Sequence, residues 1–356
     1  MADEAVFRSV KRACYAGLDS VTLRTEVAER LRRAVAFDAH AFGTADPDTG
    51  LLNHLVADRI PAPLAIEYAD ELYPLHSAAF TIDSARMGRP VFRAGSESPA
   101  IAAVERANGF HFGIDVLLAA DHRLWGKWCL LRESRGSSDV AREVALLRKL
   151  IPHLSRGLQQ ATLVDAALER ESNAAAATGV LLFDARGRSI VRSPCATPML
   201  DDLADVGVAC DGGIPLSILM LASRLRDLAK RSSDGIADTT ALRARGRSGR
   251  WYLVQASLAE THADAVARTV VVLRPMMPRE MAPMLTTLYG LSPRERDVIA
   301  GVVRGDTTKE IAARLGLSPH TVKHHLDRAC EKTGARGRRA LIARLFRDAY
   351  RPTLMT

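Results

Sequence analysis

The apolar positions in the N-terminal part of the chain change their spacing several times, which indicates a domain of mixed helices and strands. Helical spacing runs through residues 21–37. Residues 39–45 and 51–57 have strand-like composition and are joined by a Pro-Asp-Thr-Gly turn. Two apolar runs on either side of the polar residues 120–123 predict a hairpin over 113–134.

A long helix is expected to close this first region, over about residues 138–171. Its aliphatic stripe consists of leucine and isoleucine at helical intervals between Leu147 and Leu158. Pro152 is expected to bend or interrupt it, because proline lacks the amide that continues a helix. The stripe makes this helix a candidate dimerisation element.

The second region, about residues 174–275, shows the pattern of one antiparallel sheet with helices on a face. Residues 178–193 read as strand, turn and strand with Gly187 in the turn. Residues 214–230 are helical in spacing, and two later segments, 250–260 and 267–275, are rich in β-branched and aromatic residues. The proline-rich stretch that follows, residues 276–285, is expected to be a linker.

The third region, residues 286–350, is expected to be purely helical, because its helix starts and stops are marked. Ser292 and Glu295 form a capping box with a proline at the first helical position, and Thr307 and Glu310 form a second one. Ser318 begins a third helix and a fourth follows. The expected buried positions on the four helices are Val298, Ile299, Val302 and Val303; Ile311 and Leu315; Val322, Leu326, Ala329, Cys330 and Thr333; and Leu341, Ile342, Leu345 and Phe346.

Only Gly316 and Leu317 separate the second of these helices from the third, so the two helices must cross at a steep angle. Gly316 is free to adopt the left-handed conformation, Leu317 can fill the angle, and the small Ala312 allows a close approach. This spacing predicts a helix-turn-helix with the third helix in the position that reads DNA.

The side of the third helix that faces away from Val322 and Leu326 is polar and rich in hydrogen-bond donors. Lys323 could reach guanine O6 and N7, and Asp327 could accept from cytosine N4. Hydroxyls and free amides at helix starts suit phosphate. The predicted DNA-binding residues are Thr308, Lys309, Ser318, His320, Thr321, Lys323, His324, Asp327, Arg328 and Arg338.

Charge supports a nucleic-acid partner for the third region. The chain has a net charge of +8, and residues 285–350 contain 13 Lys/Arg and 7 Asp/Glu, or +6 of that total. The composition, 47% hydrophobic and 25% charged, is that of a globular protein without a membrane-sized apolar run, and no secretion signal is visible. We therefore expect a cytoplasmic protein without a membrane partner. The five cysteines are scattered without a C-x-x-C pair, so we expect neither a disulfide framework nor a zinc site. His40, His54 and His76 do not share a metal-like spacing, and we expect no metal and no cofactor.

Residues 291–346 resemble the LuxR/NarL-type helix-turn-helix over their whole length. The resemblance implies base contacts at Lys323, His324 and Asp327, and phosphate contacts at Thr308, Ser318, Thr321 and Arg338. Two departures are Thr333, where the family commonly has leucine, and Asp327, where it often has a basic or polar residue. The matching residues are Pro293, Arg294, Glu295, Gly305, Lys309, Glu310, Ile311, Ala312, Leu315, Ser318, Thr321, Val322, Lys323, His325, Leu326, Lys332 and Arg338.

The upstream regions resemble sensor domains, GAF-like over 1–165 and PAS-like over 174–275. The expected fold class is therefore α+β multidomain: a GAF-like α/β sensor, a PAS-like α+β domain and a four-helix LuxR-type helix-turn-helix. The paired acids of a phosphate-accepting receiver domain and the W-x-x-x-Y element of a lactone sensor are missing. A small-molecule effector remains unidentified. Aromatic residues of the first region either fill its core or line a ligand pocket: Tyr68, Tyr73, His76, Phe80, Trp125 and Trp128.

Together these features predict a sequence-specific transcription regulator that binds double-stranded DNA through residues 319–333 as a homodimer and is controlled by its N-terminal regions. RNA polymerase is a further candidate partner. The alternative is a sigma-factor-like promoter-recognition subunit, which shares the helix-turn-helix pattern. No catalytic motif joins a nucleophile to a base, so we expect no enzyme.

Overall fold

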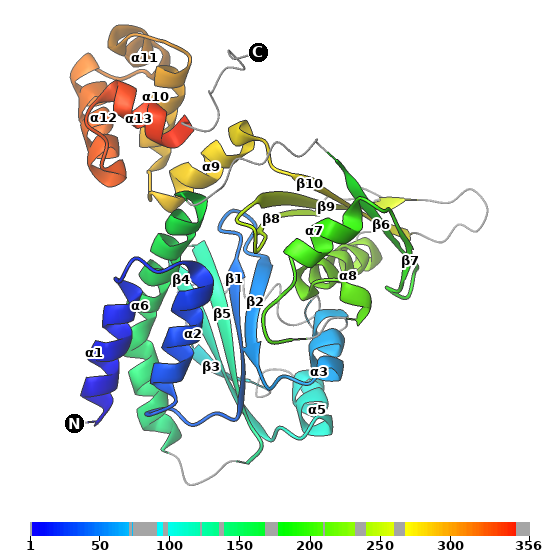
Figure 1. Ribbon diagram of the computed structural model, residues 1–356. Helices are drawn as coiled ribbons and strands as arrows, with labels where there is room; N and C mark the ends of the chain where they lie inside the picture. The colour runs from blue at the N-terminus through cyan, green and yellow to red at the C-terminus, as the bar shows by residue number, and fades with distance from the viewer. Residues whose placement is uncertain are drawn as a thin grey trace. The chain divides into compact units, whose positions relative to one another are not determined.

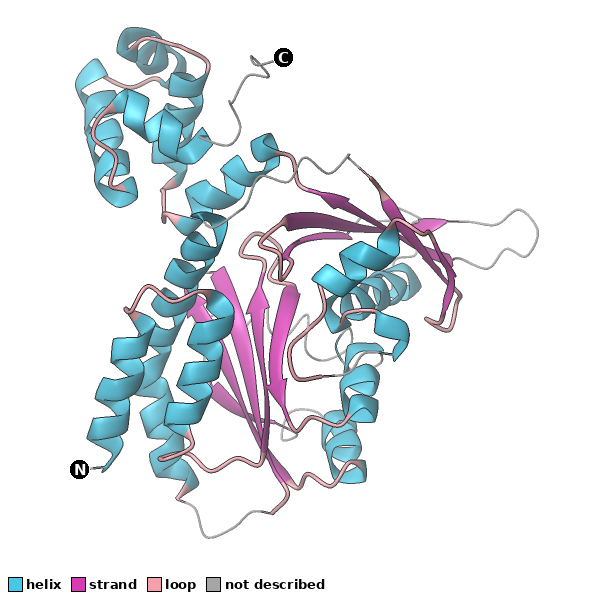
Figure 2. Cartoon of the chain, viewed as in Figure 1, coloured by secondary structure: helices cyan, strands magenta, loops and turns pink. Residues whose placement is uncertain are grey.

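The structure is a computed structural model, and it divides into two compact units, Met1–Pro275 and Met276–Thr356. Each unit is described by itself (Figures 1 and 2). The described residues are 2–70, 73, 91–94, 99–121, 123–134, 139–167, 177–208, 211–231, 240–259 and 268–346.

The first unit begins with a five-stranded antiparallel sheet in the order β2-β1-β5-β4-β3. Helices α2 and α6 pack on one face of this sheet and α1 packs on them, while α3 and α5 lie on the other side (Figure 1). The strands are β1 (Ala39–Ala45), β2 (Leu52–Asp58), β3 (Val91–Ala94), β4 (Phe112–Ala120) and β5 (Arg123–Arg132). The helices are α1 (Ala2–Cys14), α2 (Ser20–Leu31), α3 (Ala62–Glu67), α5 (Pro99–Ala107) and α6 (Val140–Ala167).

A second five-stranded antiparallel sheet follows in the order β7-β6-β10-β9-β8. Counted within each sheet, both have the strand order 2-1-5-4-3, so the unit repeats one topology that the sequence did not reveal. The strands are β6 (Gly179–Phe183), β7 (Ser189–Arg192), β8 (Thr240–Arg245), β9 (Trp251–Ala259) and β10 (Arg268–Pro275). The helices are α7 (Ala196–Asp202), the short η2 (Asp211–Gly213) and α8 (Leu216–Arg231).

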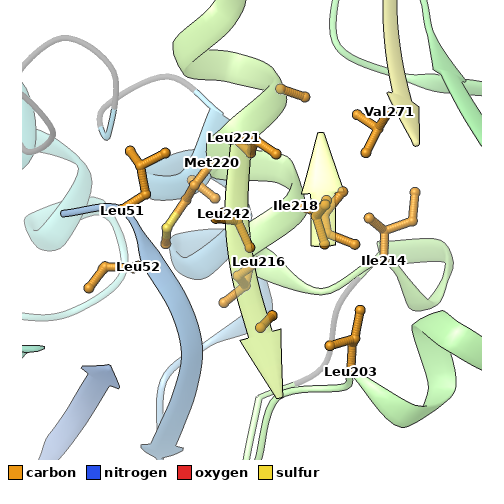
Figure 3. Close-up of a cluster of buried hydrophobic side chains, with 14 of the residues drawn as sticks. Leu51, Leu52, Leu203, Ile214, Leu216, Ile218, Met220, Leu221, Leu242 and Val271 are labelled. Carbon is orange, nitrogen blue, oxygen red and sulfur yellow. The ribbon is translucent and has the colours of Figure 1, made fainter. Parts of the chain in front are cut away.

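The two sheets share one apolar core, which is why they form a single unit. Leu51 and Leu52 of the first sheet belong to the same buried cluster as Leu216 and Met220 of α8 and Leu242 of β8 (Figure 3). Burial of such side chains is worth roughly 1.5–3 kcal/mol each. The core therefore runs across the boundary that the sequence suggested between two domains.

Polar contacts reinforce this joint. Asn53 Nδ2 donates to the Arg243 carbonyl oxygen at 2.7 Å, and Arg243 Nη2 lies 2.7 Å from Asp46 Oδ1. The Asp205 carboxylate accepts from the backbone amides of Leu55 at 2.8 Å and Leu216 at 2.9 Å. One buried carboxylate thus holds the edge strand β2 and the start of α8 together.

The predicted hairpins over 39–57, 113–134 and 178–193 are confirmed, as is the helix over 214–230. The helix α6 runs through Pro152 without interruption. Its stripe is buried in its own unit, with Leu147 and Leu150 fully inaccessible, because the sheet covers it. The interpretation of this stripe as a dimerisation face is therefore wrong.

Buried basic groups lie beneath α2. Arg24 is fully buried and donates to the carbonyl oxygens of Ser20, Phe42 and His54, and its Nη2 lies 2.9 Å from His54 Nδ1. Burial, and then the charge of Arg24, lowers the pKa of His54 to about 3. Burial, and then Arg32, lowers the pKa of His40 to about 4. Both imidazoles are neutral in the folded chain at neutral pH.

We expect the first unit to lose stability as the pH falls from 7 to 5. An unfolded histidine, with a pKa near 6.5, takes up a proton below that pH, while folded His40 and His54 do not, so acid favours the unfolded chain. Each histidine contributes about 2 kcal/mol of this loss by pH 5, and Glu105, whose folded pKa is raised to about 7, offsets about 2 kcal/mol of the total. Urea unfolding at both pH values measures it. His40→Leu should reduce the difference.

The second unit is helical throughout its described part. Its helices are α9 (Pro278–Leu288), α10 (Pro293–Val303), α11 (Thr308–Leu315), α12 (Pro319–Thr333) and α13 (Arg338–Phe346). Most residues expected as linker are thus the helix α9. Its start is stabilised because Glu280 accepts from the Met277 amide at 2.8 Å and Pro278 stands where a helix needs no amide donor. Val303, expected to be buried, is 39% exposed, and the Phe346 side chain lies outside the described residues.

Candidate nucleic-acid interface

The first helix of the interface unit, α10, begins as its sequence predicts. Ser292 accepts from the Glu295 amide at 3.2 Å, and Glu295 accepts from the Ser292 amide at 2.7 Å. The same Glu295 carboxylate lies 2.7 Å from Lys332 Nζ near the end of α12, and Lys332 also donates to the Gly290 carbonyl oxygen. Although burial acts to raise it, these hydrogen bonds lower the pKa of Glu295. The contact ties the start of α10 to the end of α12.

Glu295→Ala is expected to destabilise this helical unit by about 2 kcal/mol, because it leaves the Ser292 amide and the Lys332 ammonium without their charged acceptor. Amide hydrogen exchange of α10 and α12 should speed up accordingly. Glu331→Ala removes an exposed acid from the same helix α12 and should leave exchange unchanged. Equal protection in both variants would contradict the contact's structural role.

The turn between α11 and α12 has the predicted geometry. Gly316 adopts φ 64° and ψ 37°, the left-handed conformation, and the Leu317 amide donates to the Ala312 carbonyl oxygen at 2.9 Å. Leu317 packs against the cluster of Val302, Ile311 and Val322. Ser318 then caps α12 by accepting from the Thr321 amide at 3.0 Å.

The helix α12 divides into a buried and an exposed side. Val322 and Ala329 are fully inaccessible and Thr333 is 2% exposed, whereas Leu326 and Cys330 are half-buried. The polar side lies in solvent within this unit. Of the predicted DNA-binding residues, Lys309, Ser318, His320, Lys323, His324, Asp327 and Arg328 are exposed, and Thr308, Thr321 and Arg338 are half-buried.

The cations of this unit fall into two groups. Asp306 pairs with Arg304 and Arg314, and Arg338 donates to the Asp306 carbonyl oxygen. By contrast, no salt bridge within the described part of the unit engages Lys309, Lys323 or Arg328. These three side chains are exposed and available to an external anion. Across the residues described, no cluster of three His, Cys, Asp or Glu could hold a metal ion.

Comparison with known proteins agrees with this geometry. The model for bacterial regulatory proteins of the luxR family matches residues 290–345. Spore germination protein GerE of Bacillus subtilis is 42% identical over 57 residues, which make up 16% of this chain and 77% of GerE. The chain belongs to the luxR family. It is a helix-turn-helix, DNA-binding regulator of transcription.

Two further relatives match this luxR-family chain over the same short part. The probable transcriptional regulatory protein SgaR of Hyphomicrobium methylovorum is 41% identical over 56 residues, and NarL of Mycobacterium tuberculosis is 42% identical over 58. The chain spans about a quarter of their lengths, 26% and 27%. A phage VqmA–DPO complex shares 20% identity over 50% of this chain and 84% of its own, with a TM-score of 0.24.

In the first unit of this luxR-family chain, the residues predicted for a ligand pocket are dispersed. Tyr68 lines a cavity, while Tyr73 is buried and its hydroxyl accepts from the Leu52 amide at 3.2 Å. Trp128 stacks on Phe42, with 4.5 Å between the ring centroids, on the face of β5 opposite the cavity. Trp125 is buried and donates to the Ala120 carbonyl oxygen. His76 and Phe80 lie outside the described residues.

Sequence reasoning missed the charged residues of that cavity, Glu105, Asp115 and Lys127. A signal was present, because Asp115 and Lys127 interrupt the two apolar runs of the predicted hairpin.

Among the described helices, none has the length and apolar character required to cross a membrane.

Proposed function

We propose that this chain recognises double-stranded DNA by placing α12 in the major groove. The observation that carries the proposal is the exposed polar side of α12, where Lys323, His324 and Asp327 face solvent while Val322 anchors the helix. A helix of this kind fits the width of the groove. Lys323 would donate to guanine O6 and N7, and Asp327 would accept from cytosine N4.

Contacts to the phosphate backbone would fix the register of α12. Lys309 is exposed in the first turn of α11, and Thr308 begins that helix. Ser318 and Thr321 stand at the start of α12, where free amides and the helix dipole favour an anion. Arg338 begins α13, and His320 and Arg328 flank the reading side.

We further propose that two copies bind one site. The 15-residue α12 covers a single half-site, and two-fold operators place half-sites about 34 Å apart. The N-terminal unit would control binding as a sensor, with a GAF-like part over 1–165 and a PAS-like part over 174–275. Its two sheets have the same strand order. This supports the sensor proposal over the sigma-factor-like alternative, whose upstream domain would be all-helical.

The test is selection of bound fragments from a genomic library, followed by footprinting and sedimentation of the full chain with the selected duplex. We expect a two-fold symmetric footprint and two chains per duplex. A monomer at high concentration, alone and with DNA, would remove the dimer proposal. Indifference to duplex DNA at low salt would remove the DNA proposal itself. Promoter-specific transcription by core polymerase with this chain alone would favour the alternative of a sigma-factor-like subunit.

A further inference from the structure

A cavity opens on the face of the first sheet that carries α3 and α5. Its walls are mostly aliphatic, and it has a volume of about 70 Å³, room for a small ligand. Ala41 and Leu55 come from the first sheet and Leu64 from α3. Leu216 and Met220 come from α8, the helix that packs on the second sheet. A molecule in this cavity would touch both halves of the unit.

One end of the cavity is charged, and its groups are buried. Lys127 Nζ lies 3.2 Å from Asp115 Oδ2 and donates to the Tyr68 hydroxyl at 2.7 Å. Lys127 is 6% exposed, Asp115 4% and Glu105 7%. The second oxygen of the Asp115 carboxylate, Oδ1, is buried and receives no N–H or O–H donor from the described residues. A buried carboxylate oxygen without a donor is costly and marks a place where an outside donor would be stabilised.

The charges at this end do not balance. Asp115 and Lys127 offset each other as an ion pair, and among the described residues Glu105 is a second carboxylate that forms no salt bridge. Burial, and then the neighbouring Asp115, raises the pKa of Glu105 to about 7. At neutral pH Glu105 is therefore about half ionised, so an entering cation would favour its ionised form, whereas an entering anion would be repelled by it and by Asp115.

A purely structural ion pair does not account for these features together. Such a pair would place both carboxylate oxygens on donors and pack its surroundings tightly, because an incompletely satisfied buried charge destabilises the fold. Here, among the described residues, Asp115 Oδ1 has no N–H or O–H donor, the weakly donating Cys129 thiol is the neighbour that bonds the Asp115 carboxylate, and aliphatic walls beside it enclose open space. The polar end and the apolar walls complement a molecule with one donor-bearing head and an apolar body.

We propose that this cavity binds a small amphipathic amine. The ammonium head would donate to Asp115 Oδ1 and offset the charge of Glu105, and the hydrocarbon body would lie along Ala41, Leu64 and Met220. This proposal rests on the sensor role proposed above and names the chemical class of the ligand. The ligand would stabilise the joint between the two sheets by contacting both halves of the unit.

The experiment titrates the full chain, without DNA, with hexylamine, hexan-1-ol and hexanoate, which share one hydrocarbon body. Saturation-transfer NMR and the unfolding midpoint of the first unit report binding. We expect hexylamine to bind about tenfold or more tighter than hexan-1-ol, and hexanoate to give no binding, because a hydrogen bond between two charged groups is the strongest available. No binding of hexylamine, or equal affinity for hexan-1-ol or hexanoate, would overturn the amine assignment.

Two variants locate the site. Asp115→Asn should weaken hexylamine binding about tenfold or more, with Asp201→Asn as an exposed control of equal charge change. Ala41→Leu fills the cavity and leaves all three charged groups in place, so it should abolish binding even where Asp115→Asn fails to fold. Unchanged hexylamine affinity in Ala41→Leu would place the amine elsewhere. Because DNA is absent from this titration, its outcome is independent of whether α12 binds DNA.

Discussion

Lys323→Ala is expected to lower the affinity of the chain for its selected DNA site roughly 5- to 150-fold, which corresponds to about 1–3 kcal/mol for a lost bidentate contact to guanine. The side chain is exposed on α12, and no carboxylate of the described residues competes for it. Its removal should also relax the preference at one base pair. Loss of a phosphate contact would instead weaken binding to all sequences alike.

Fluorescence anisotropy with the selected duplex and with single-base variants of it measures both effects at one fixed salt concentration. Lys149→Ala is the matched control, because it removes an equal charge from an exposed position on α6 in the other unit. If Lys323→Ala keeps the full base preference, Lys323 does not read a base and the assignment of α12 as the reading helix loses its main residue.

Gly207→Ala is expected to destabilise the first unit by about 2–5 kcal/mol. Gly207 has φ +74°, where an alanine costs about 1–2 kcal/mol, and a Cβ atom there would lie 1.9 Å from the Ala57 carbonyl oxygen. The contact is with backbone, so a strand must move, at a cost of roughly 1–3 kcal/mol or more. The neighbouring Val206 forms a β-bridge with Val56 of β2, in which the Ala57 amide donates to the Val206 carbonyl oxygen at 2.8 Å. The movement would therefore open the joint between the sheets.

Gly17→Ala is the control for this substitution. Gly17 has φ +72°, almost the same backbone conformation, but nothing lies within 4 Å of the added Cβ. It should therefore show only the conformational cost, about 1–2 kcal/mol. Urea unfolding of both variants separates the two contributions. Equal losses in the two variants would mean that the approach of Gly207 to β2 is not tight.

The helix-turn-helix was largely predictable because its signals are local. Ser292 and Glu295, Thr307 and Glu310, and Gly316 each act within four residues, so the sequence alone places the helix ends. Val303 shows the limit of such reasoning. An apolar side chain at the end of α10 fits the helical spacing, but only the packing of the other helices decides whether it is covered.

The joining of the two sheets was not predictable, since it depends on contacts distant in sequence. Arg243 reaches Asp46 across 197 positions, and Asp205 reaches Leu55 across 150. The short strand β8 has only two fully buried residues, Leu242 and Ala244, and so brief an alternation of apolar and polar residues does not mark a strand. The cavity depends on the same contacts, because α8 supplies one of its walls.

The carboxylate of Asp205, with one oxygen on β2 and the other on α8, bears on how this chain can be rearranged by recombination. A gene fusion that swaps residues 174–275 for the corresponding piece of another regulator would separate Asp205 from the Leu55 amide and expose a shared core. A crossover at 275/276 would sever neither contact. Interchangeable parts in chimeric regulators should therefore be the whole N-terminal unit and the helical C-terminal unit, and not the three pieces suggested by the sequence pattern.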